Sequence, residues 1–204
     1  MDVDKQSSLD LKIGKYLTDY IQRNRAARVL SQGLRVVGVG LRPLISHIVF
    51  RSLDIDQRAI EFLNEGFEYD KDLGLIRYPC WKSKVYRKAG YPAIVIDQAC
   101  EDDHKSSSLI PEWVNIFSDQ AVHHIAVFVD DLHEAIFYLE KQGVPFSEKV
   151  AGLRGSDLRM VFSTPEKVEG KAFNVLALLE SHGHGQILSP QTEGLFQAIQ
   201  EIYE

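Results

Sequence analysis

Two histidines, His47 and His124, occupy matching places in two similar stretches of this sequence. Each lies in a short run rich in β-branched and aromatic residues, ISHIVF and VHHIAVFV, which is typical of a strand. One strand histidine is usually structural, but a matched pair without an evident partner points to a shared ligand. Neutral imidazoles suit first-row transition metals, and one carboxylate completes a two-histidine, one-carboxylate face. The pair therefore predicts a site for a single divalent ion.

The carboxylate of this predicted site is expected on the strand at 172–180, beside the strand of His124. Its only carboxylate is Glu180, at the end of VLALLE. Alternation along a strand groups Glu180 with Leu178, and a solvated strand end is the simpler interpretation of this residue. Asp97, which ends YPAIVID in the first half, is the competing ligand.

Two cations are candidates for holding an acidic substrate. Arg51 lies four residues beyond His47 on the same strand face, roughly 13 Å away along the strand. An inward arginine needs an anion, which is either an internal acid or a substrate carboxylate. Lys84, in the cation-rich strand WKSKVYR, is the second candidate, although a strand with one solvent-exposed face is the simplest explanation of these cations. By the same alternation, His123 should point outward.

The two histidines belong to an internal repeat. Residues 46–67, moved along by 77 positions, lie without gaps on residues 123–144. Each copy reads as a strand, an aspartate at a helix N-cap, a helix, and a glycine that ends it. Further strands follow each copy, at 73–77, 81–87 and 91–98 in the first half and at 145–151, 157–163 and 172–180 in the second.

Each half is thus a β-α-β-β-β module, and the predicted fold class is α+β. Two such modules can pair and enclose a pocket, because neither buries both faces of its sheet alone. The N-terminal region, 1–43, is expected to contain a disordered tail (1–9) and an amphipathic helix (10–33). The first module follows at 44–98, a linker at 99–121 and the second module at 122–180. The C-terminal region, 181–204, is expected to be a tail with a helix at about 190–203.

Composition describes an ordinary globular chain of 204 residues, 45% apolar and 25% charged. A net charge of −6 argues against a nucleic-acid partner. No apolar run approaches the roughly 20 residues that cross a bilayer, and no secretory pattern opens the sequence. Cys80 and Cys100 are expected to be reduced thiols in the cytoplasm. A homodimer is plausible, since modules of this shape pair within or between chains.

The repeat resembles the vicinal oxygen chelate superfamily, whose usual module opening is similar to HHIAVFVDDLHEAIFYLEKQGVPF. The first half, SHIVFRSLD followed by GFEYDKDLGLIRYPCWKSKVYRKAGYPAIVIDQ, resembles the 2-oxoadipate dioxygenase/decarboxylase family. That family opens with a metal histidine followed four residues later by a substrate-binding arginine, as His47 and Arg51 do. The resemblance implies a glyoxalase/dioxygenase-like open barrel with an added N-terminal helix.

The resemblance further implies a mononuclear Fe(II) dioxygenase/decarboxylase that uses O₂ and a small 2-oxo acid such as 2-oxoadipate. His47, His124 and Glu180 would hold the metal, for which Zn, Ni and Mn are alternatives. Arg51 would be the catalytic-site cation that grips the substrate. The family's carboxylate usually lies within the final strand, whose interior here reads Leu176-Ala177-Leu178, so Glu180 requires a shifted register.

Two other functions remain open from the sequence. A glyoxalase-like lyase or isomerase with Zn or Ni would need a fourth protein ligand, and Asp97 is the candidate. A non-catalytic module that binds a carboxylate would need the pocket but no metal.

Overall fold

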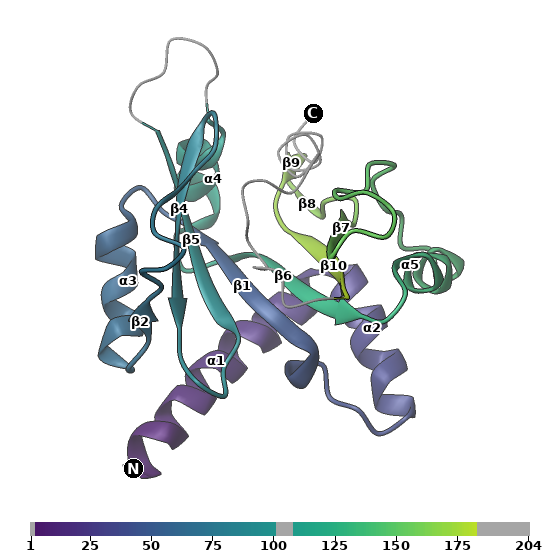
Figure 1. Cartoon of the computed structure of the whole chain (residues 1–204), viewed down its shortest axis with the longest axis horizontal. Coiled ribbons are helices and arrows are strands. Elements are labelled where there is room, and N and C mark those ends of the chain that lie inside the picture. The colour runs from purple at the N-terminus through teal and green to yellow at the C-terminus, as the bar shows by residue number, and fades with distance from the viewer. Residues whose placement is uncertain (1–2, 101–107, 183–204) are drawn as a thin grey trace.

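The computed structural model describes residues 3–100 and 108–182 of the chain. Within these residues, eight strands form one curved sheet and most helices lie on one side of it (Figure 1). The helices are α1 (Val3–Arg23), α2 (Arg25–Val36), α3 (Ile55–Asn64), α4 (Ile110–Phe117) and α5 (Leu132–Lys141), with a 3-10 turn, η1, at Arg42–Leu44.

The strand order in this sheet shows two similar halves. From one edge to the other the sheet contains β2 (Glu68–Tyr69), β4 (Trp81–Arg87), β5 (Ala93–Ala99), β1 (Ile45–Arg51), β6 (Val122–Val129), β10 (Val175–Ser181) and β7 (Leu158–Phe162), and β3 (Ile76–Arg77) also pairs with β4. The short strands β8 (Lys167–Val168) and β9 (Lys171–Ala172) form a separate hairpin. β1 and β6 pair antiparallel at the centre, and each has a parallel neighbour, β5 or β10. The predicted α+β class and paired modules are confirmed.

Local sequence explains why both repeats turn from strand to helix at the same place. Asp54 accepts hydrogen bonds from the backbone N–H groups of residues 56 and 57, and Asp131 accepts one from that of residue 134. These N-caps satisfy donors that the first helical turn leaves open. Gly66 and Gly143 end the helices at positive φ angles of 84° and 75°, which side chains disfavour. The predicted helix boundaries are confirmed in both copies.

The two faces of the sheet have different surroundings. The convex face packs on α1, α2, α3 and α5, and its core includes Ile48, Ile125 and Leu176, all fully buried. The concave face carries two smaller apolar clusters, formed mainly by strand residues that alternate with those of the convex core. The helix layer therefore secures one face of the sheet and leaves the other to form a pocket.

Several predicted elements differ from the structure. Residues 3–9, predicted as a disordered tail, belong to α1, and the single helix predicted at 10–33 is two helices that meet at Asn24. The segment 145–151 makes only isolated bridges at Phe146 and Ala151. In the segment 73–77, only Ile76 and Arg77 are in a strand.

Helix α4 was not predicted at all, because residues 99–121 read as a polar linker. Its apolar residues Ile110 and Trp113 are three positions apart and both buried, which is too short a pattern to recognise in an eight-residue helix. The helix predicted at about 190–203 lies outside the described residues.

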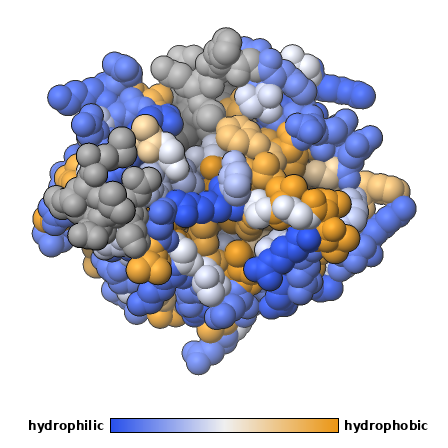
Figure 2. All heavy atoms as spheres, turned by 90° about the horizontal axis from the view of Figure 1, so that it is seen from below, coloured by the Kyte–Doolittle hydropathy of each residue, from blue (hydrophilic) through white to orange (hydrophobic). Residues whose placement is uncertain are grey.

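The surface view in Figure 2 shows hydrophilic residues around the outline of one face and apolar residues gathered nearer its middle. Among the described residues, no helix combines the length and the apolar character that a membrane span requires. Cys80 and Cys100 are thiols that are not joined in a disulfide.

A buried asparagine joins α1 and α2 to the second module, which allows a test of this packing. Asn24 caps α2 by accepting from Ala27 N–H (2.8 Å) and donates to the Asn174 side chain (3.0 Å). Replacing Asn24 by Ala removes the cap and a buried hydrogen bond, so Asn24→Ala should lower the free energy of unfolding by about 1–3 kcal/mol. Urea denaturation measures this, with exposed Gln22→Ala as the control; equal midpoints would contradict the role of Asn24.

Candidate metal and acid site

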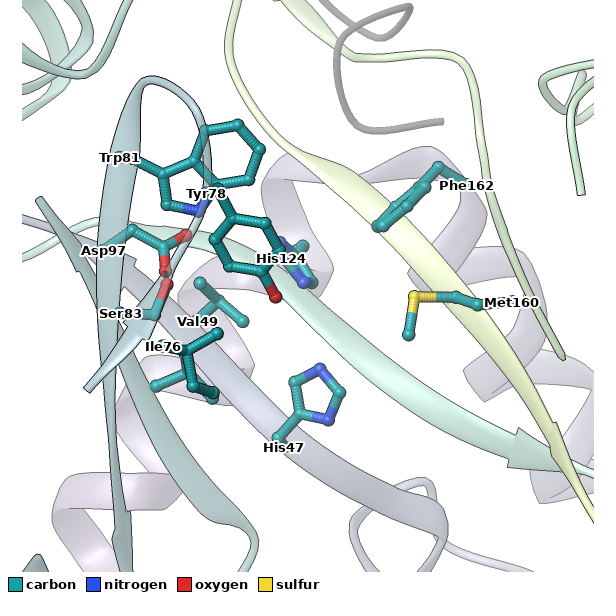
Figure 3. Close-up of a pocket in the computed structure, with 11 residues that line it drawn as sticks. His47, Val49, Ile76, Tyr78, Trp81, Ser83, Asp97, His124, Met160 and Phe162 are labelled. Carbon is teal, nitrogen blue, oxygen red and sulfur yellow. Dashed lines mark hydrogen bonds between the residues drawn. The ribbon is translucent and has the colours of Figure 1, made fainter. Parts of the chain in front are cut away.

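The concave face holds a cavity between the two modules (Figure 3). Its empty volume is about 410 Å³, counting its opening to solvent. Apolar side chains form most of the wall, and the polar groups come from both modules. The lining residues are His47, Val49, Ile76, Tyr78, Trp81, Ser83, Val95, Asp97, His124, Met160 and Phe162. This composition, mostly apolar with few polar groups, is typical of a small-molecule site.

His47 and His124 face each other across the centre of the sheet, as the repeat predicts. Their ring centroids lie 5.9 Å apart, with the rings nearly perpendicular. Two imidazoles that share an ion through nitrogens about 2.1 Å from it have centroids roughly 4.5–6.5 Å apart. The spacing of this pair therefore suits a shared ion.

Each of the two imidazoles has a polar neighbour at Nδ1. The Nδ1 of His47 lies 3.1 Å from Ser46 Oγ, and that of His124 lies 2.9 Å from the Nδ1 of His123. The tautomers that donate from Nδ1 leave a lone pair on Nε2. Partners at the second ring nitrogen orient metal-bound histidines in the same way.

The prediction that His123 points outward is wrong. His123 is 2% exposed, and its ring contacts both His124 and Trp113. The pairing of β1 with β6 shifts register here, because Val49 pairs with His124 and Phe50 with Val122, leaving His123 as an extra residue. Such a bulge breaks strict alternation and re-aims side chains. No residue in the sequence marks its place.

Burial keeps all three histidines neutral. It lowers the pKa of His47 to about 3, and it lowers the pKa of His123 and of His124 well below the usual value. Nearby positive charge acts in the same direction: Arg51 lowers the pKa of both His123 and His124. A neutral imidazole is the form that binds a metal ion.

The structure contradicts Glu180 as the third ligand. In the register of β10 with β6, Glu180 pairs with Val129 and lies on the convex face with Leu178. The shifted register that the metal prediction requires is therefore not present. Its carboxylate accepts from the Leu132 backbone N–H (2.7 Å) and from Arg159 (3.3 Å). Burial raises the pKa of Glu180, but these hydrogen bonds and one with His182 hold it below the usual value. The carboxylate is a structural partner of α5 and β7.

Lys84 also lies on the opposite face, so the prediction that it binds substrate is wrong. It pairs with Ile96 of the convex core, and its ammonium group contacts Asp56 at 2.5 Å. Its neighbour Ser83 faces the cavity instead, as does Trp81 of the same strand. One position along a strand decides the face.

Arg51 lies on the concave side, beyond the cavity wall. It is 5% exposed, its guanidinium lies 5.5 Å from the Trp113 ring centroid, and its register partner is Asp97. Among the described residues, the cavity lining includes Asp97 and not Arg51. Trp113 anchors this end by donating from Nε1 to the Phe173 carbonyl at 2.6 Å. The contact between α4 and the sheet is long-range and was missed in the sequence.

Asp97 is the carboxylate that the structure places in the cavity. Ser83 Oγ donates to it at 2.5 Å. Burial raises the pKa of Asp97 to about 6, although Ser83 and Arg51 act in the opposite direction. Burial and the nearby Asp97 charge also raise the pKa of Tyr78. This end of the cavity therefore has two groups that retain protons unusually well, with the cation Arg51 behind its wall.

These residues supply part of a metal site. Two neutral imidazoles with oriented Nε2 atoms fit a divalent transition metal. Within residues 3–100 and 108–182, however, no three His, Cys, Asp or Glu side chains come close enough to hold an ion together. The donor set that the structure supports is thus two histidines, His47 and His124.

Comparison with known proteins supports the fold. No protein-family model and no curated protein match the chain. A Shewanella frigidimarina protein with a provisional hydrolase assignment matches with a TM-score of 0.72 at 13% identity, over 88% of this chain and 95% of that one. A Ralstonia eutropha protein provisionally placed in the glyoxalase superfamily matches with a TM-score of 0.59 at 10% identity. The match covers 80% of this chain and 79% of that one.

A mutant of 4-hydroxymandelate synthase from Streptomyces coelicolor matches with a TM-score of 0.59 and 17% identity. The match covers 80% of this chain but only 56% of the synthase. At these identities the likeness concerns the fold. The expected glyoxalase/dioxygenase-like architecture is confirmed.

The raised pKa of Asp97 predicts a pH effect on stability. The folded protein holds this proton up to about pH 6, whereas the unfolded chain releases it near 3.8. The contribution of Asp97 is therefore complete below pH 3.8 and lost as pH rises through 6. Asp97→Asn should flatten this change and stabilise the protein near pH 7 by about 1–3 kcal/mol. Urea denaturation at pH 4–7 tests it, with exposed Asp72→Asn as control; parallel wild-type and Asp97→Asn profiles would refute it.

Proposed function

We propose that this chain is a metal-dependent enzyme that acts on a small 2-oxo acid, with Fe(II) and O₂, as a dioxygenase/decarboxylase. The observation that carries this proposal is the facing pair His47 and His124 on the first strands of two repeated modules. The sequence resemblance to the 2-oxoadipate dioxygenase/decarboxylase family supports it. A fold shared with 4-hydroxymandelate synthase is consistent with it.

The residues of the cavity have separate tasks in this proposal. His47 and His124 would hold the ion through Nε2, and their Nδ1 partners would fix the ring orientations. A bound ferrous ion supplies a template and a Lewis acid for the keto acid and for O₂. The apolar walls at Val49, Met160 and Phe162 exclude water from the acid's carbon chain.

The charged end of the cavity would receive the substrate's second carboxylate. Arg51 supplies positive charge there, and Asp97 opposes it when ionised. Tyr78 and Ser83 bring hydroxyl groups to the same cavity. A dicarboxylate would then have one acid group at the histidines and the other near Arg51.

A direct test of this proposal combines metal binding with oxygen consumption. Anaerobic titration in the presence of 2-oxoadipate should show one Fe(II) per chain. His47→Ala and His124→Ala should each weaken Fe(II) binding by at least roughly tenfold, since each removes a ligand. With 2-oxoadipate, O₂ uptake should equal CO₂ release and should disappear in both variants.

Two controls separate ligand loss from other effects. Exposed His133→Ala and convex-face Glu180→Gln should keep the Fe(II) affinity of the wild type. Circular dichroism checks that each variant folds. Unchanged affinity in both histidine variants would exclude the metal assignment, and bound iron without O₂ uptake on any 2-oxo acid would exclude the oxygenase.

A second candidate function is a carboxylate-binding module without a metal. The incomplete donor set at His47 and His124 is the observation that favours it. Such a module would bind an oxo acid equally well with and without a chelator. A lyase or isomerase with Zn or Ni is separated from both by elemental analysis of protein purified without chelators.

The Arg51–Asp97 pair predicts opposite effects of two substitutions on acid binding. At an effective dielectric of 20, a unit charge about 12 Å away contributes roughly 1.4 kcal/mol, which is a tenfold change in affinity, and a nearer charge contributes more. Arg51→Gln should therefore raise the Kd for 2-oxoadipate, and Asp97→Asn should lower it. Isothermal titration measures both, and pyruvate, which lacks the second carboxylate, should respond much less. Shifts in the same direction would rule out this placement of the acid.

A further inference from the structure

The concave face of β10 faces the histidine pair with apolar side chains only. Its residues on this side are Val175, Ala177 and Leu179, each at most 1% exposed. In the sheet register, Ala126 pairs with His47 on one side and with Ala177 on the other. His124 pairs with Val175. Ala177 therefore lies in the same cross-strand row as His47 and two positions beyond the partner of His124.

This row puts Ala177 where a longer acidic side chain would reach the histidines. Neighbouring strands are about 4.8 Å apart, so Ala177 and His47 have backbones roughly 10 Å apart on one face. A glutamate and a histidine side chain each extend about half that distance, and the intervening residue is Ala126, whose methyl group leaves space. With alanine at 177, no carboxylate from residues 3–100 or 108–182 completes a set of three ligands with the histidines.

The missing carboxylate changes the charge balance of a bound ion. A divalent ion on two neutral imidazoles keeps its whole charge of +2, and Arg51 adds positive charge nearby. Placing such a charge in a buried, largely apolar cavity is costly unless an anion accompanies it. A protein carboxylate beside the ion would normally offset part of this cost. Among the described residues, Asp97 lines the cavity but does not group with the two histidines as a ligand set, so the anion on the ion is expected to be the bound acid.

We propose that the anionic substrate itself completes the metal site, so that the chain binds its divalent ion tightly only together with a 2-oxo carboxylate. This inference rests on the proposed function and assigns Ala177 as the residue that makes metal binding depend on substrate. The 2-oxo acid class fits because its carboxylate and keto oxygens supply two adjacent ligands and a negative charge. Linkage makes the coupling reciprocal: the ion must strengthen acid binding by the same factor.

The test uses Co²⁺ as the metal probe and pyruvate as the acid, under conditions in which no turnover occurs. Isothermal titration and the visible absorption of Co²⁺ report binding, after correction for the Co²⁺–pyruvate complex in solution. Saturating pyruvate should lower the Kd for Co²⁺ by roughly 5- to 150-fold, and Co²⁺ should lower the Kd for pyruvate equally.

Two matched substitutions at position 177 test whether the missing carboxylate makes Co²⁺ binding depend on pyruvate. Ala177→Glu should bind Co²⁺ tightly without pyruvate and lose most of the coupling. Ala177→Gln has the same size without the charge and should keep the behaviour of the wild type. If Ala177→Glu does not fold by circular dichroism, the coupling measured in the wild-type chain still decides the proposal.

The outcomes separate this inference from the proposed function. Co²⁺ that binds the wild-type chain with the same Kd with and without pyruvate overturns the inference and leaves the metal assignment intact. If Ala177→Glu and Ala177→Gln strengthen Co²⁺ binding equally in the absence of pyruvate, the inference is also overturned. A wild-type chain that binds no Co²⁺ in the presence or absence of pyruvate overturns the proposed function as well.

Discussion

The antiparallel pairing of β1 with β6 is the constraint on which the site depends. It is the seam between the two repeats, and it places the first strand of each module beside that of the other. Residues at equivalent repeat positions therefore come together near a pseudo-twofold axis. The bulge at His123 lies in this same seam, so the pairing both brings His47 and His124 face to face and places a third imidazole behind them.

The helix layer makes this seam rigid. Fully buried Ile48 and Ile125 alternate with the histidines and pack into the convex core. The Tyr20 hydroxyl on α1 donates to the Val175 carbonyl of β10, which ties the N-terminal helix to the second module. Because the core residues alternate with the cavity residues, the packing that stabilises the fold also determines which side chains enter the cavity.

Much of this arrangement could be predicted from the sequence, because repetition and period-two alternation act locally. The modules, both N-caps and the facing histidines followed from residues within each repeat. The two wrongly assigned site residues, Glu180 and Lys84, share one origin: they were chosen by residue type, whereas strand parity places both on the convex face. The bulge at His123 and the contact of Trp113 with Arg51 depend on the pairing of distant segments, which no local pattern records.

The position of Glu180 also explains why the carboxylate that the sequence analysis assigned to the metal site is not available to it. With Arg159 it forms a buried ion pair, both side chains 7% exposed, and it also accepts from the first turn of α5. Removing one partner of such a pair leaves an uncompensated buried charge and typically costs about 3–5 kcal/mol. A shift of β10 by one residue would expose Glu180 to the cavity, but it would break this pair and turn Leu176 and Leu178 out of the core. The fold therefore retains Glu180 as a structural acid. For chemistry, the concave face offers the two histidines and Asp97, together with the anion of a bound substrate.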